Sequence, residues 1–237
     1  MTLRPDHSTP TALVTGGSRG LGRALVADLA GSGWHVITDG RDAAALAAAH
    51  SDRSVRAIPG DVADPAHRHE LAAAIEAGGR LDLLVHNASL LGPSPLPALA
   101  DHPLDAYEDL LRANVVAPLA LTQLLLPLLR RSGGRIVAVS SDAAVEAYAG
   151  WGAYGSSKAA LDQLAAVLAA EELALRVYAF DPGDMRTDMH QRAFPGEDIS
   201  DRPEPETVVP ALRRLVDEDL PSGRYRAAAL LPAGAPA

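Results

Sequence analysis

The stretch that decides the fold is TALVTGGSRGLG, residues 11 to 22. The run TALV ends at a pair of glycines, and LGRALVADLAGSG follows with apolar residues spaced three and four apart. The first pattern predicts a short buried strand, and the second predicts an amphipathic helix closed by Gly31 and Gly33. Glycines between a strand and a helix let the backbone approach a pyrophosphate at the helix amino terminus. This stretch therefore predicts a nucleotide-binding turn.

The same alternation of strand and helix continues along the chain. Strands that are apolar on both faces indicate a parallel sheet covered by helices on both sides. We therefore expect an α/β fold with a doubly wound parallel sheet of the Rossmann type. The whole chain, 1–237, is expected to form one domain, with the cofactor half at about 8–140 and the active site and substrate loop at about 141–205. Further strands are predicted in HVITDG, SVRAIPGD, RLDLLVHNAS, GGRIVAVSS, LRVYAFDPGD and GRYRAAALLP, and helices from about 43, over 65–77, 105–131 and 152–173, and up to about 218.

Composition excludes several classes of protein. The net charge of −9 argues against a nucleic-acid surface, and the absence of cysteine excludes a disulfide framework. The opening residues MTLRPDHSTP lack the apolar core of a signal peptide. The apolar stretch VVAPLALTQLLLPLL, residues 115–129, is shorter than a membrane span and contains two prolines. We expect a soluble cytoplasmic protein without membrane partners, whose closing PAGAPA frays.

The end of the second predicted strand bears on the choice between NAD and NADP. An acidic side chain there binds the ribose 2′-hydroxyl, whereas a basic side chain accommodates a 2′-phosphate. The chain offers Asp39, Gly40 and Arg41, and strand alternation allows only one of Asp39 and Gly40 to face the ribose. Arg19, inside the glycine-rich turn, adds a second positive group. The pattern favours NADP(H) over NAD(H), and the register at Asp39 stays open.

A tyrosine and a lysine share one face of a predicted helix. Lys158 is the only lysine among 21 basic residues, and it follows Tyr154 by four positions. A phenol has an ordinary pKa of about 10, which a nearby ammonium lowers. Arginine stays charged and is no substitute in a proton relay. The pair is therefore a candidate acid–base site in which Lys158 lowers the pKa of Tyr154.

Several motifs lie in order along the chain, each at the matching element of the alternation. They are TGGSRGLG, GDVAD, HNAS, ANVVAP, VSSDA, YGSSK and DPGDMRT, which begin at residues 15, 60, 86, 113, 139, 154 and 181. With this ordered set the sequence resembles the short-chain dehydrogenase/reductase family over essentially its whole length. The resemblance implies an NAD(P)-dependent oxidoreductase that reduces a ketone or aldehyde, or oxidises an alcohol, by hydride transfer.

The resemblance also implies roles for individual residues. In the catalytic set, Asn114 holds a water of the proton relay, Ser141 hydrogen-bonds the substrate carbonyl, Tyr154 is the general acid and Lys158 is its partner. Ser140 is the rival of Ser141, which has the family's spacing of thirteen residues before the tyrosine. The implied cofactor contacts are Gly16, Ser18, Arg19, Gly20, Leu21, Gly22, Arg41, Asp61, Val62, Asn87, Ala88, Tyr154, Lys158, Pro182, Gly183 and Thr187.

The chain departs from the family pattern at two places. His86 and Ser89 of HNAS stand where the family more often has asparagine and glycine, which leaves the local backbone open. The carboxyl end lacks the family's Gly-Gly turn after the last strand. The partners implied are a small carbonyl or alcohol substrate and a second copy of the chain, in a homodimer or homotetramer built on helices 105–131 and 152–173.

Two other functions stay open at this point. One is a non-catalytic dinucleotide sensor or scaffold on the same fold, and the other is a dehydratase or epimerase that uses the cofactor transiently. The complete tyrosine and lysine pair argues against the sensor. A metal site is not expected, because His67 and His69 stand two residues apart on a predicted helix and so point to different faces.

Overall fold

The computed structural model describes residues 9–231, and its centre is a seven-stranded sheet. The strand order is β3-β2-β1-β4-β5-β6-β7, and every neighbouring pair is parallel. The order changes direction between β1 and β4, so the predicted doubly wound parallel sheet is confirmed. The strands are β1 (Thr11–Val14), β2 (His35–Gly40), β3 (Val55–Pro59), β4 (Leu83–His86), β5 (Arg135–Val139), β6 (Arg176–Asp181) and β7 (Gly223–Arg226).

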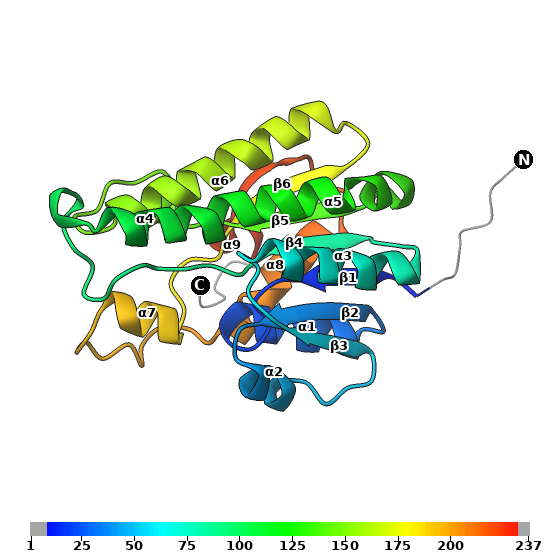
Figure 1. Ribbon diagram of the computed structural model, residues 1–237, viewed down its shortest axis with the longest axis horizontal. Helices are drawn as coiled ribbons and strands as arrows, with labels where there is room; N and C mark the ends of the chain where they lie inside the picture. Colours follow the sequence, from blue (N-terminus) through cyan, green and yellow to red (C-terminus); the bar gives the residue numbers. More distant parts are fainter. Residues whose placement is uncertain (1–8, 232–237) are drawn as a thin grey trace, which may run out of the picture.

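Helices cover both faces of the sheet (Figure 1). One apolar core lies between the sheet and α1 (Gly20–Gly31) with α8 (Val209–Asp217), and the other lies beneath α3 (Pro65–Gly78), α5 (Ala117–Ser132) and α6 (Gly152–Glu171). Because both faces are covered, all four residues of β1 and of β4 are buried. The shorter elements are α2 (Ala43–Ala49), η1 (Leu99–Asp101), α4 (Leu104–Leu111), η2 (Arg112–Val116), η3 (Asp142–Ala144), α7 (Asp188–Ala193), η4 (Pro205–Thr207) and α9 (Ala227–Leu230).

The predicted helical region at 105–131 is one continuous helical run, Leu104–Ser132, made of α4, the π-helical η2 and α5. Within residues 9–231 it is the one helix long and apolar enough to cross a membrane, so the prediction that its apolar stretch is too short was wrong. Pro118 falls in the first turn of α5, where proline is tolerated, and Pro127 does not end the helix. The run serves as a core helix here, because Leu121, Leu125 and Leu129 are completely buried against the sheet and its neighbours.

Two predicted segments differ from the structure. The last predicted strand ends at Arg226, and the alanines that follow form α9, because alanine favours a helix over a strand. The stretch 183–205, expected to be irregular, contains the short helix α7. The predictions for the closing PAGAPA and for the first eight residues of MTLRPDHSTP lie outside the described residues.

Candidate active site

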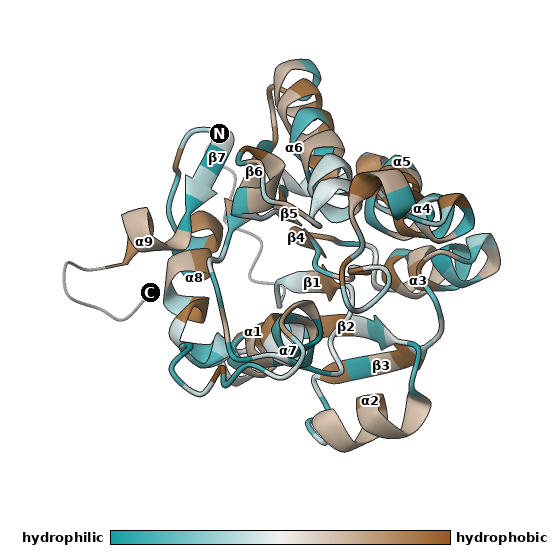
Figure 2. Cartoon of the chain, turned by 90° about the vertical axis from the view of Figure 1, so that its left-hand side faces the viewer, coloured by the Kyte–Doolittle hydropathy of each residue, from teal (hydrophilic) through white to brown (hydrophobic). Residues whose placement is uncertain are grey.

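A cleft of about 820 Å³ opens at the carboxyl ends of β1, β2, β4, β5 and β6. Figure 2 views the molecule from the end of the sheet over which α7 lies. Of the residues implied by the family resemblance, all but Gly22 and Asn114 line this cleft. Residues far apart in the sequence therefore meet along one surface, at the edge where open parallel sheets bind ligands.

The glycine-rich turn is shaped to accept a phosphate. Gly16 and Gly20 have φ angles of +73° and +55°, in the left-handed region that favours glycine. A Cβ on Gly22 would lie 2.3 Å from the carbonyl oxygen of Gly16, so packing forbids a side chain there. The helix that follows, α1, begins without a side-chain cap. Its first N–H groups thus lack a side-chain acceptor, and the residues present fit a dinucleotide pyrophosphate.

Two polar side chains, each directly after one of the strands β1 and β4, support this turn. Asn87 donates from Nδ2 to the carbonyls of Thr15, at 2.8 Å, and of Gly16, at 3.1 Å. The Thr15 hydroxyl accepts from the N–H groups of Asn87 and Ala88, both at 3.1 Å. Thr15 opens the motif TGGSRGLG, but unlike Asn87 it is absent from the cofactor contacts that the family resemblance implies.

At the end of β2, the Asp39 side chain points into the protein and the Arg41 side chain points to the cleft. The Asp39 carboxylate is buried and both of its oxygens have partners. Oδ1 accepts from the Gly16 N–H at 2.7 Å, and Oδ2 lies 3.1 Å from Nε2 of His67. Arg41 is exposed, lines the cleft and forms no ion pair with any residue in the described part of the chain. Arg19 also lines the cleft, where it pairs with Asp188 of α7 at 3.1 Å in an exposed ion pair.

Asp61 and Val62, which the family resemblance implies as contacts of the cofactor's adenine, lie at the same end of the cleft. Asp61 is exposed, and its Oδ1 accepts from the N–H of Ala63 at 2.9 Å. Val62 is buried beside it. At the other end of the cleft, Pro182, Gly183 and Thr187 follow β6, and the Thr187 hydroxyl caps α7 by accepting from an N–H one turn later.

Tyr154 and Lys158 come together as the spacing predicts. Both are buried, and Lys158 Nζ lies 5.5 Å from the centroid of the tyrosine ring. Nζ donates to the carbonyl of Val139 at 2.7 Å, and burial lowers the pKa of Lys158 to about 8. Burial raises the pKa of Tyr154 above its ordinary value, although hydrogen bonding to Ser89 and Ser141 opposes this.

The prediction that Lys158 lowers the pKa of Tyr154 below its ordinary value was therefore wrong, because the pKa is raised. Removing a phenolate from water disfavours it by more than the hydrogen bonds restore, and the negative charges of Asp142 and Asp181 add to the effect. The phenol carries its proton at neutral pH, as an unperturbed tyrosine also does. That is the state a general acid requires.

The two candidate serines differ in position. Ser140 is 2% exposed, and its backbone pairs with β6. Both serines line the cleft, but Ser141 is only half-buried. Its hydroxyl donates to Asp142 Oδ1 at 3.0 Å and accepts from the N–H of Ala143 at 3.2 Å. Ser141 is thus the serine better placed to meet a ligand oxygen.

Asn114 lies behind the cleft, in the π-helical η2. Its Oδ1 accepts from Leu90 N–H at 2.8 Å and from Ser89 Oγ at 3.2 Å. Its Nδ2 donates to the Leu90 carbonyl at 2.9 Å and to Ser157 Oγ at 3.0 Å. The side-chain amide has then used its full hydrogen-bonding capacity, so any water held by Asn114 must meet its backbone. Ser89, the departure from the family pattern, is one of these partners.

An apolar wall flanks the tyrosine. The Trp151 ring lies edge-on to Tyr154, with centroids 5.7 Å apart, and contacts Phe194 at 5.8 Å. Leu91 and Met189 line the cleft nearby and belong to the same apolar cluster. A carbonyl at Tyr154 would therefore meet apolar surface on this side.

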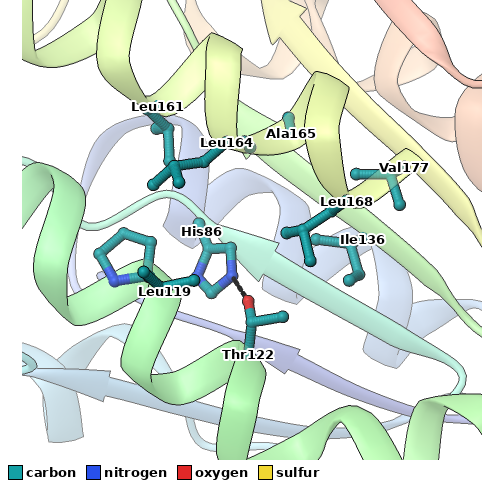
Figure 3. Close-up of a pocket in the computed structure, with 11 residues that line it drawn as sticks. His86, Leu119, Thr122, Ile136, Leu161, Leu164, Ala165, Leu168 and Val177 are labelled. Atoms are coloured by element: carbon teal, nitrogen blue, oxygen red, sulfur yellow. Dashed lines mark hydrogen bonds between the residues drawn. The ribbon is translucent and has the colours of Figure 1, made fainter. Parts of the chain in front are cut away.

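His86, the other departure in HNAS, lies away from the cleft. Figure 3 shows its ring among apolar side chains of α5 and α6, such as Leu119 and Leu161, with Nε2 bonded to Thr122 Oγ1 at 2.8 Å. The cavity beside it measures about 10 Å³, too small for an organic ligand. Burial lowers the pKa of His86 to about 3, so the ring is a neutral part of the core.

Comparisons with known proteins bear on the family of this chain. A family model described as short chain dehydrogenase matches residues 10–198. The chain is 36% identical over 218 residues to the uncharacterized oxidoreductase YciK of Escherichia coli, covering 87% of this chain and 86% of that protein. It is 33% identical over 238 residues to a benzil reductase of Saccharomyces cerevisiae, covering 95% and 86%. A solved Escherichia coli structure, classed as a short chain dehydrogenase and complexed with NADPH, matches with a TM-score of 0.85 at 34% identity, over 92% of this chain and 96% of that one.

Proposed function

The chain belongs to the short-chain dehydrogenase family, and from that premise we propose that it is an NADP(H)-dependent reductase of ketones or aldehydes, acting in reverse as an alcohol dehydrogenase. The observation that carries the proposal is that Ser141, Tyr154 and Lys158 line the same cleft as the glycine-rich turn. A dinucleotide bound at the turn would lie in the cleft that Tyr154 also lines.

The cleft residues supply the proton chemistry. When bound, the nicotinamide supplies a hydride to the carbonyl carbon. Tyr154, whose phenol is protonated at neutral pH, donates its proton to the carbonyl oxygen, which completes an alcohol. Ser141 donates a hydrogen bond to the same oxygen as its charge develops. The Lys158 ammonium, 5.5 Å from the ring centroid, stabilises the tyrosinate that remains.

The preference for NADP(H) is supported by the end of β2. An NAD-binding site would present a free carboxylate to the ribose 2′-hydroxyl, but both oxygens of Asp39 already have partners inside the protein. Arg41 is exposed at the cleft and can meet a 2′-phosphate, with Arg19 as the second cation once it leaves Asp188. A relative of known structure is complexed with NADPH.

The proposal includes a homo-oligomer that works in the cytoplasm. Val116, at the start of the α5 helical region, is 52% exposed, and Val167 of α6 is 40% exposed. In the dimer expected from the sequence, these two side chains would be covered by the second copy. Light scattering after gel filtration measures the molar mass, and a monomer at micromolar concentration would contradict this part.

Titration calorimetry of the purified protein with NADPH and with NADH is the first test. We expect tighter binding of NADPH than of NADH. When aromatic or aliphatic carbonyls are added, NADPH should be oxidised and its absorbance should fall. Binding without net consumption for any carbonyl would favour the dehydratase or epimerase alternative. Binding of neither dinucleotide would favour a scaffold and contradict the proposal.

A further inference from the structure

A buried ion pair lies behind the glycine-rich turn and outside the catalytic set. Asp39 of β2 and His67 of α3 approach to 3.1 Å, with side chains only 2% and 4% exposed. Neither residue is assigned a role by the family motifs. Buried charges are unfavourable unless they are paired and hydrogen-bonded, so a pair at this position requires an explanation.

Asp39 holds the first peptide groups of the glycine-rich turn. Its carboxylate accepts from the N–H of Gly16 at 2.7 Å, and its backbone carbonyl accepts from the N–H of Gly17 at 2.9 Å. The carbonyl of Gly16 is held from the opposite side by Asn87, at 3.1 Å. The Gly16 residue is therefore held at both its N–H and its C=O, in a left-handed conformation with φ of +73°.

His67 in turn holds Asp39. It stands in the first turn of α3, and its ring packs over Gly60, where a Cβ would lie only 2.1 Å from Nδ1. The hydrogen bond to Asp39 raises the pKa of His67, against the opposing effect of burial. The other charged group near the ring is Glu70, 3.8 Å from Nδ1. Without His67, the Asp39 carboxylate would lose the buried donor on Oδ2.

We propose that Asp39 and His67 are positioning residues for the cofactor, which hold the glycine-rich turn in the shape that receives the pyrophosphate. The inference rests on the proposed function, because it takes the cleft to be a dinucleotide site. It also assigns Asp39 a role other than that of a ribose ligand. NADPH and NADH share the pyrophosphate, so loss of the pair weakens both by the same factor, whereas loss of a ribose ligand changes their ratio.

The test uses four variants. Asp39→Asn removes the charge of the acceptor, and His67→Ala removes its partner. His67→Gln keeps a side-chain N–H that can donate to Asp39, and it serves as the conservative rescue. His69→Ala is the matched control, because His69 is an exposed histidine on the same helix. Two quantities are measured for each: the dissociation constants of NADPH and NADH by calorimetry, and amide hydrogen exchange at Gly16 and Gly17 in dinucleotide-free protein.

We expect Asp39→Asn and His67→Ala to weaken NADPH and NADH about tenfold each, the loss of one charge-assisted hydrogen bond, with an unchanged ratio. Exchange at Gly16 and Gly17 should accelerate by a similar factor, and His67→Gln should recover most of both losses. A changed NADPH to NADH ratio in Asp39→Asn would show a ribose ligand and overturn the inference. So would wild-type exchange at the turn in both disruptive variants.

Different results would contradict the proposed function and the positioning role of the buried pair. If wild-type protein binds neither dinucleotide, the proposed function and the cofactor role both fall, whatever the exchange rates show. If wild-type protein binds NADPH but His67→Ala leaves both affinities and the exchange rates unchanged, only the positioning role falls. Should Asp39→Asn fail to fold, His67→Ala decides the question, because it leaves the hydrogen bond to Gly16 in place while removing the support behind it.

Discussion

Arg224, on the last strand, donates from Nη2 to the backbone carbonyl of Ser141 at 2.8 Å, across 83 residues of sequence. The same guanidinium binds the carboxylates of Asp162, at 3.0 Å, and Asp181, at 3.1 Å. Asp162 lies one helical turn after Lys158, and Asp181 directly precedes Pro182. One side chain of β7 thus connects three segments of the proposed active site.

Replacing Arg224→Met should lower kcat for carbonyl reduction about tenfold and reduce the free energy of unfolding by about 2 kcal/mol, since hydrogen bonds to charged groups are lost. With two carboxylates no longer neutralised, the pKa of Tyr154 should rise further, and the pH profile of alcohol oxidation should move to higher pH. The matched control is Arg213→Met, which removes a similarly buried arginine from α8, away from the cleft. An unchanged pH profile would contradict the inference that Arg224 neutralises carboxylates near Tyr154.

Tyr154→Phe should reduce kcat by about 10²- to 10⁴-fold, the usual contribution of a general acid, without weakening NADPH binding. The ring that packs against Trp151 is kept, and only the hydroxyl is lost. Single-turnover kinetics and calorimetry separate the two effects. Tyr148→Phe is the control, because that hydroxyl bonds Glu146 and Asp142 outside the proposed proton path. Residual turnover equal to wild type would exclude Tyr154 as the acid.

Arg41→Ala should raise the dissociation constant of NADPH about tenfold and leave that of NADH nearly unchanged, because only NADPH carries the 2′-phosphate. Titration calorimetry of both dinucleotides measures the ratio. Arg53→Ala removes an exposed arginine that does not line the cleft, so it controls for net charge. Equal increases in the dissociation constants of NADPH and NADH would show that Arg41 does not bind the 2′-phosphate.

His86→Asn should make the protein less sensitive to acid. The folded-state pKa of His86, about 3, lies below its unfolded value, about 6.5. The unfolded chain therefore binds one more proton between these limits, and wild-type stability falls by about 1.4 kcal/mol for each unit of acidification there. Denaturant unfolding between pH 7 and 4 should show a shallower decline in the variant. A parallel decline would mean that His86 is protonated in the folded state.

His67 should act with the opposite sign. Its folded-state pKa is raised by Asp39, so its contribution to stability is complete below the unfolded pKa of about 6.5 and is lost as the pH rises through the raised value. The difference in the free energy of unfolding between wild type and His67→Ala should be largest in mild acid and shrink in alkali. Thermal denaturation across this range measures it, and a difference that grows with pH would contradict the pairing.

Much of this protein is predictable from local patterns. The alternation that begins at residue 11 predicts the parallel sheet, because apolar periodicity depends on neighbours in the sequence. The spacing of Tyr154 and Lys158 predicts that they share a helix face, as they do. The two prolines in 115–129 were counted against a long apolar span in the sequence, but they do not interrupt the helix. One of them falls at a helix start, and the other is tolerated inside.

The sequence by itself determined the order of strands and helices, the glycine-rich turn and the set of side chains at the strand ends, all of which follow from residues close together in the chain. Only the tertiary structure decided that Asp39 turns inward to Gly16 and His67, that Arg224 reaches Ser141, and that the pKa of Tyr154 rises instead of falling. Those outcomes depend on burial and on partners 23 to 83 residues away. Desolvation and long-range contact arise only when separate elements pack together.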